Sequence, residues 1–149
     1  MRTPSFPTWV WIALTAQFLG YVFDAVWHGL LFPGLEPETR GEMIRHLAMV
    51  HLPLYIGVAG TLLATARAAL DARERFTLAP RRVALAGATL SAIGEAWHAI
   101  SHLRMDTHAA PMAGILSVAG FVIVVTAMGV ATRRARKADA DRPNQRRAA

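Results

Sequence analysis

The sequence predicts an all-α protein, a polytopic membrane bundle of four helices, and its composition and hydropathy pattern carry that prediction. Of 149 residues, 54% are hydrophobic and only 17% are charged, which is too apolar for an ordinary soluble domain. Four stretches are each long enough to cross a hydrocarbon core of about 30 Å as a helix. None alternates with the period of two typical of membrane β-strands, so we expect helices to satisfy the backbone in lipid.

The four spans are expected near residues 8–32, 46–69, 82–104 and 111–132. The first is too long for a cleaved signal peptide, has no Ala-x-Ala site before the next polar segment and carries Asp24 and His28 near its end. We therefore expect it to be retained as a span. Residues 1–137 then form the transmembrane domain. Residues 138–149, with Pro143 and alternating charges, are expected to be a disordered basic cytoplasmic tail.

Basic side chains are distributed unevenly among the connections between the spans. The connection between the second and third spans and the tail hold most of them, whereas the other two connections hold only Arg40, Arg45 and Arg104. Since cytoplasmic segments carry the excess of Lys and Arg, both termini are expected in the cytoplasm (N-in/C-in), with the protein in the cell inner (plasma) membrane. The net charge of +6 is then explained by the orientation of the chain in the membrane. We therefore expect the lipid bilayer, not nucleic acid, as a partner.

This topology brings all six histidines to the periplasmic or extracellular half of the bundle. The two carboxylates inside spans, Asp24 and Glu95, fall in the same half. Residues at i, i+4, i+7 and i+11 line one face of a helix. Two such stripes contain these acids: Gln17, Tyr21, Asp24 and His28 in the first span, and Ser91, Glu95, His98 and His102 in the third.

The second span contributes His46 and His51, five residues apart. On an ideal α-helix five residues turn about 140°, so only one of the two is expected to face the centre of the bundle. We choose His51 because it lies deeper. His46 follows Arg45 at the membrane boundary, where the alternatives to a ligand role are solvation or a place as an outer-shell partner of the ligands.

A weak internal repeat is also visible. Residues 24–28 (DAVWH) resemble residues 95–98 (EAWH) with one residue deleted. In the spans that follow, His51, Pro53 and Gly57 match His108, Pro111 and Gly114. The pattern suggests a tandem duplication of a helical hairpin, related by an axis along the membrane normal.

The clustered imidazoles and carboxylates predict a metal centre of one or two ions. There is no Cys, so the donors are nitrogen and oxygen, which favours Fe or Zn. Glu95-x-x-His98 has the spacing that carboxylate-bridged di-iron bundles use. The predicted ligands are Asp24, His28, His51, Glu95, His98 and His102, with His46 and His108 as further candidates. Gln17, Tyr21 and Ser91 are expected to orient these ligands by hydrogen bonds.

Three functions fit this pattern, and whether the chain is an enzyme stays open. A di-iron centre would oxidise a lipophilic small molecule with O₂, as an oxidoreductase, and a zinc centre would activate water for hydrolysis. A b-type haem held by opposed histidines would make the chain an electron carrier. A proton or metal-ion transport protein would use the same groups as a pathway. The alternative without a metal or cofactor is that these residues only form polar contacts between helices. The sequence identifies no catalytic residue. It is compatible with an oligomer.

Overall fold

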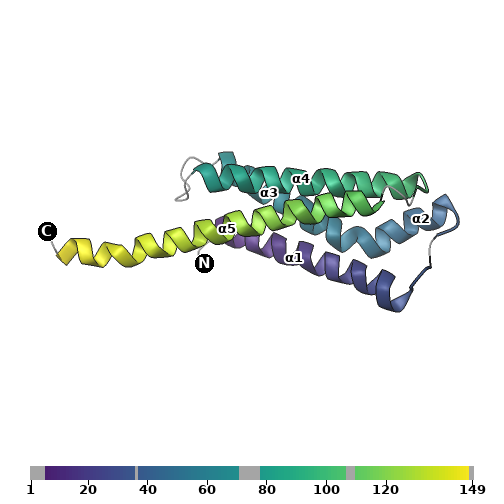
Figure 1. Ribbon diagram of the computed structural model, residues 1–149, viewed down its shortest axis with the longest axis horizontal. Coiled ribbons are helices and arrows are strands. Elements are labelled where there is room, and N and C mark those ends of the chain that lie inside the picture. The colour runs from purple at the N-terminus through teal and green to yellow at the C-terminus, as the bar shows by residue number, and fades with distance from the viewer. Residues whose placement is uncertain (1–5, 36, 71–77, 107–109, 148–149) are drawn as a thin grey trace, which may run out of the picture.

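The computed structural model describes residues 6–35, 37–70, 78–106 and 110–147 (Figure 1). Across these residues the chain is helical, apart from short turns, and contains no strand. Two segments, η1 and η2, are π-helical and continue neighbouring α-helices. The elements in order are α1 (Phe6–Val26), η1 (Trp27–Leu31), α2 (Arg40–His46), η2 (Leu47–His51), α3 (Leu52–Leu70), α4 (Leu78–Leu103) and α5 (Ala110–Arg147).

Four helical segments are long and apolar enough to cross a membrane, which confirms the predicted all-α fold with four spans. The second is assembled from α2, η2 and α3, which run on without a break. The spans are Thr8–Leu31, Arg40–Leu70, Ala79–Leu103 and Pro111–Lys137. Each exceeds the roughly 20 residues that a helix needs. The chain thus has the architecture of a multi-pass membrane protein.

Large apolar side chains cover the outside of this bundle. Leu63 is 71% exposed and Ile56 is 60% exposed, and many other large apolar side chains are exposed as well. A soluble protein rarely exposes so much apolar surface to water. The buried positions instead hold many small and polar side chains, among them Gln17, Ser91 and Ser117, all at 2% exposure or less. An apolar exterior around a tightly packed interior of small residues is typical of helices packed in lipid.

The helices form two antiparallel hairpins that pack side by side. α1 packs on α3, α4 packs on α5, and α3 joins the two pairs by packing on α4. Both chain ends lie at one end of the bundle, and α2 lies at the other (Figure 1). We call the end with α2 the distal end. Both π-helical segments lie at or near the distal end, since η1 follows α1 there and η2 continues α2.

Glycines let the helices within each hairpin approach closely. A Cβ atom at Gly57 would collide with the backbone of Gln17, and one at Gly120 would collide with the backbone of Ser91. Gly20 meets Leu54, and Gly94 meets Ser117, in the same way. These contacts fix the depth at which each helix meets its partner.

We expect Gly120→Ala to destabilise the bundle, because the added methyl group must push α5 away from α4. Gly114→Ala is the matched control on the same helix, since a Cβ there meets nothing within 4 Å. Thermal melting of the two variants in detergent measures the difference. Gly114→Ala should melt at or above the wild-type temperature, and equal melting temperatures would contradict the assigned contact.

The contacts of these glycines relate the two hairpins in a register different from the one suggested by the sequence. Gln17 and Gly20 on α1 occupy the places of Ser91 and Gly94 on α4, so the counterpart of Gly57 is Gly120. The sequence match set Gly57 against Gly114, which has no close neighbour.

The last helix is longer than the sequence analysis expects. The fourth span is placed at residues 111–132 and the tail from 138 is expected to be disordered, but α5 continues to Arg147. Residues 133–142 are rich in Ala, Arg and Lys, which favour helix, and nothing in them ends it. In Figure 1 this part of α5 extends beyond the rest of the bundle.

Candidate metal centre

A π-helical segment brings both histidines of the second span to the same face. His46 ends α2 and His51 ends η2. An α-helix would separate them by about 140°, but the wider turns of a π-helix bring residues five apart closer to the same face. Their ring centroids are 5.2 Å apart. The expectation that only His51 faces the centre is therefore wrong for this local geometry, and His46 joins the group.

His51 lies at the middle of five histidines at the distal end. Its side chain is 1% exposed. The ring centroids of the other four lie 5.2 to 5.9 Å from its own. These neighbours come from η1, α2 and α4, and they are His28, His46, His98 and His102. We call the five residues the histidine cluster.

Asp24 contacts the cluster from α1. Its Oδ1 atom lies 3.2 Å from Nδ1 of His51 and 3.6 Å from Nε2 of His28. The His51 contact has the distance of an ion pair but not the angles of a hydrogen bond, and both ring nitrogens of His51 lack a hydrogen-bond partner among the described residues. Oδ1 of Asp24 and Nδ1 of His51 thus lie close to each other without a hydrogen bond between them.

His98 and His102 form the α4 side of the cluster. They are one turn apart, and their Nε2 atoms lie 3.0 Å from each other. Two imidazole nitrogens at this distance need either a shared proton or a cation between them. Nδ1 of His102 is buried without a hydrogen-bond partner in the part of the chain that the structure describes.

The cluster resolves into two groups of three potential ligands. One contains His28, His46 and His51, and the other contains His51, His98 and His102. In each group the donor atoms lie within 4.8 Å of one another. Ligand atoms of a tetrahedral zinc ion, bound at about 2.0–2.1 Å, are separated by about 3.4 Å. Small side-chain rotations would therefore close either group around an ion.

Glu95 lies deeper than the histidines, one turn before His98 on α4. It is 4% exposed, Ser117 hydrogen-bonds its side chain, and it interacts electrostatically with His98 and Asp24. Its Oε2 atom has no hydrogen-bond partner among the described residues. Glu95 belongs to neither group of three histidines, so it adjoins the cluster as a second carboxylate, more deeply buried than Asp24.

A hydrogen-bond network lies beneath the cluster and joins α1, α4 and α5. Nε2 of Gln17 donates to the hydroxyl of Tyr21 at 3.0 Å and to the hydroxyl of Ser91 at 2.8 Å. Tyr21 in turn shares a 2.6 Å hydrogen bond with Ser117. The three residues expected to orient the ligands thus lie together, and Ser117 links them to Glu95.

Sequence reasoning missed two neighbours of the cluster. Ser117 contacts both the network and Glu95, and its place in line with Gly114 and Gly120 along one face of α5 was the available signal. Tyr55 stacks on His51, with ring centroids 5.9 Å apart, and follows it by one turn. Its buried hydroxyl has no hydrogen-bond partner among the described residues. His108, a further candidate ligand, lies outside those residues.

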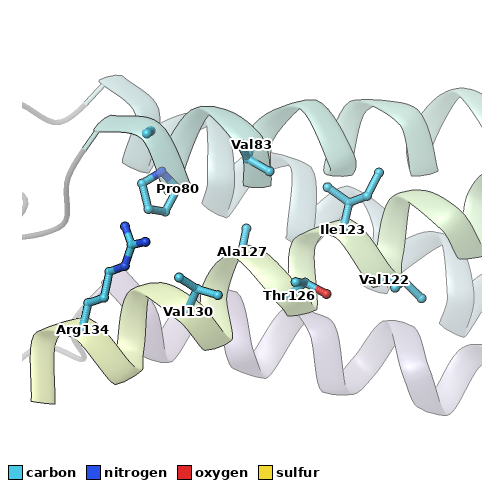
Figure 2. Close-up of a pocket in the computed structure, with 9 residues that line it drawn as sticks. Pro80, Val83, Val122, Ile123, Thr126, Ala127, Val130 and Arg134 are labelled. Carbon is cyan, nitrogen blue, oxygen red and sulfur yellow. The ribbon is translucent and has the colours of Figure 1, made fainter. Parts of the chain in front are cut away.

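An apolar groove of about 440 Å³ runs between α4 and α5, away from the cluster (Figure 2). It lies beside the first turns of α4, whereas His98 and His102 are near the end of that helix. Val83, Ile123 and Val130 line it, and Arg134 closes one end. The groove therefore gives no lateral entry to the histidines.

Comparison of the chain with protein-family models, with curated proteins and with solved structures finds no significant match.

Proposed function

We propose that this chain is an integral-membrane metalloprotein whose centre is held by the histidine cluster, Asp24 and Glu95. The observation that carries the proposal is the convergence of five imidazoles from three spans around the buried His51. Metal binding accounts for both the number of donors and their mutual distances. A histidine that only joins two helices by a hydrogen bond needs a single polar partner, not four other imidazoles around it.

The cost of leaving these groups unbound supports the proposal. A buried polar atom without a hydrogen bond costs about 1–3 kcal/mol, and several such atoms gather here. They include Nε2 of His46, both ring nitrogens of His51 and Oδ1 of Asp24. A carboxylate within a span costs a further 2.5–3.5 kcal/mol on insertion scales, roughly, unless it is compensated. A cation would offset all of these costs at once.

The donor chemistry favours iron or zinc. Imidazole nitrogens and carboxylate oxygens suit borderline divalent ions, and no thiolate competes because the chain has no Cys. Tyr21 and Ser117, hydrogen-bonded beneath the site, would hold Glu95 and its neighbours in place. Such a centre could serve an oxidoreductase with iron or a hydrolase with zinc, acting on a lipophilic substrate.

The contacts among the imidazoles favour a compact centre over a b-type haem. A porphyrin between two axial histidines needs its whole plane free of other side chains. Nε2 of His98 is 3.0 Å from Nε2 of His102, and the ring of His51 lies 5.3 and 5.5 Å from theirs. A haem would have to separate all three rings.

Metal analysis of the detergent-purified chain, with an optical spectrum, tests the proposal. We expect near-stoichiometric Fe or Zn and no Soret band. A Soret band would replace the proposal with the haem carrier. Metal-free protein that exchanges protons or ions in liposomes would replace it with a transport function, since buried acids and imidazoles also form such pathways.

We further propose that the termini face the cytoplasm and the distal end faces the periplasm or the exterior, because the basic connections lie at the end of the termini. Topology reporters fused at Glu38 and at the C terminus should give opposite signals. Glu38 lies between η1 and α2, at the distal end. Equal signals would contradict four crossings, and reversed signals would place the cluster on the cytoplasmic side.

A further inference from the structure

We propose that His51 binds two metal ions at once, as an imidazolate that bridges a site with His28 and His46 to a site with His98 and His102. The inference rests on the metal centre proposed above and specifies its architecture. One ion would also be close to Asp24. The other would lie on the α4 side, next to Glu95.

The membership of the two ligand groups is the first support. Each group of three histidines can hold an ion by itself, and His51 is the member that they share. The other four histidines belong to one group each. Two separate ions in these groups must therefore either compete for His51 or share it. An imidazole has two nitrogens on opposite sides of its ring, so sharing is geometrically available.

The surroundings of the His51 ring are the second support. A histidine that binds one ion normally donates its other N–H to a carboxylate, a backbone carbonyl or water, which fixes the orientation of the ring. His51 has no such hydrogen bond among the described residues at either nitrogen, although its side chain is only 1% exposed. Asp24 is 3.2 Å from Nδ1 but not aligned to accept a proton from it. Both nitrogens are thus open to an ion.

The relation between the two hairpins is the third support. The glycine contacts match Gln17 with Ser91 and Gly20 with Gly94. The same offset along the chain carries Asp24 to His98 and His28 to His102. Each hairpin therefore presents an equivalent pair of donors, one turn apart, to the centre. On the second helices, the offset that matches Gly57 with Gly120 carries His51 to Gly114, so the central imidazole has no duplicate.

Bridging requires one proton to leave. Neutral imidazole carries a proton on one nitrogen and a lone pair on the other. The first ion takes the existing lone pair; the second replaces the proton, which passes to water while the freed pair forms the new bond. No electron is transferred. The imidazolate, Asp24 and Glu95 then offer three negative charges to offset two divalent ions in a low dielectric.

Copper(II) loading of the metal-stripped full chain tests the bridge. After removal of loosely bound ions with glycine, we expect two Cu²⁺ per chain and a strongly reduced electron paramagnetic resonance signal, because an imidazolate couples the two spins. One Cu²⁺ per chain, or two with the full signal of isolated ions, would overturn the bridge while leaving a metal centre. No bound Cu²⁺ would overturn the proposed function itself.

Paired variants provide the matched controls. His28→Ala with His46→Ala should leave one Cu²⁺ with an uncoupled signal, and His98→Ala with His102→Ala should do the same from the other side. Circular dichroism and gel filtration report whether each variant folds, and the wild-type measurement decides the question if one does not. A double variant that retains both ions and their coupling would contradict the ligand assignment.

Discussion

Replacing His51 with alanine is expected to remove all specifically bound metal. Loss of a residue that merely orients a ligand costs about 10–100-fold in metal affinity, so loss of the ligand shared by both groups of histidines should cost more than about 100-fold. Metal content per chain after dialysis measures the effect. Met49→Ala is the control, because Met49 lies in the same π-helical segment and is 63% exposed.

The stability of the variant needs a separate comparison, because truncating a buried side chain destabilises a bundle by itself. We therefore compare melting temperatures with and without a chelator. A ligand at 100 times its dissociation constant stabilises the folded state by about 2.7 kcal/mol, so wild type should melt lower after chelation. The melting temperature of His51→Ala should be the same with and without the chelator. Full metal content in folded His51→Ala would refute the site.

The four spans could be predicted because length and hydropathy are local properties. A helix in lipid needs about 20 apolar residues, and the blocks of the sequence exceed that length clearly. The stripes on the first and third spans were predictable for a similar reason, since the face of an α-helix follows from its periodicity. His98 and His102 contact each other as that periodicity requires.

The position of His46 could not be predicted, because the helix around it departs from α geometry. The sequence-based placement of His46 relative to His51 assumes a rotation of 100° per residue. The π-helical segment η2 has a smaller rotation per residue over Leu47–His51. No residue type specifies a π-helical segment reliably, and such segments occur at functional sites more often than elsewhere. The structure therefore groups His46, a less certain candidate ligand on sequence grounds, with His28 and His51.

The contacts between helices could not be predicted from the sequence either. Small residues indicate where helices can approach, but they do not give the register in which two helices meet. Gly57 meets Gln17, and Gly120 meets Ser91, and only these contacts show which positions of the two hairpins correspond. Ser117 escaped notice for the same reason: its role depends on Tyr21, which lies on a distant span.

Replacing the two acids within the spans by their amides, Asp24→Asn with Glu95→Gln, is expected to weaken metal binding strongly while the metal-free protein becomes more stable. The amides keep the size of the side chains but remove charge that would offset the cation. Without metal, those same charges destabilise the folded protein, because Glu95 is 4% exposed and an ionised carboxylate inside a span is energetically unfavourable. The two effects have opposite signs and arise from one substitution pair.

Glu38→Gln removes one charge at an exposed position outside the spans and serves as the control. Metal content and the melting temperature after chelation should both match wild type in this variant. In the double amide variant, metal content should fall and the chelated protein should melt above chelated wild type. A variant that keeps its metal in full would show that the acids do not balance a cation. A variant that loses metal and also melts lower would show that the carboxylates hold the helices together through hydrogen bonds, as Ser117 does with Glu95, and not chiefly through their charge.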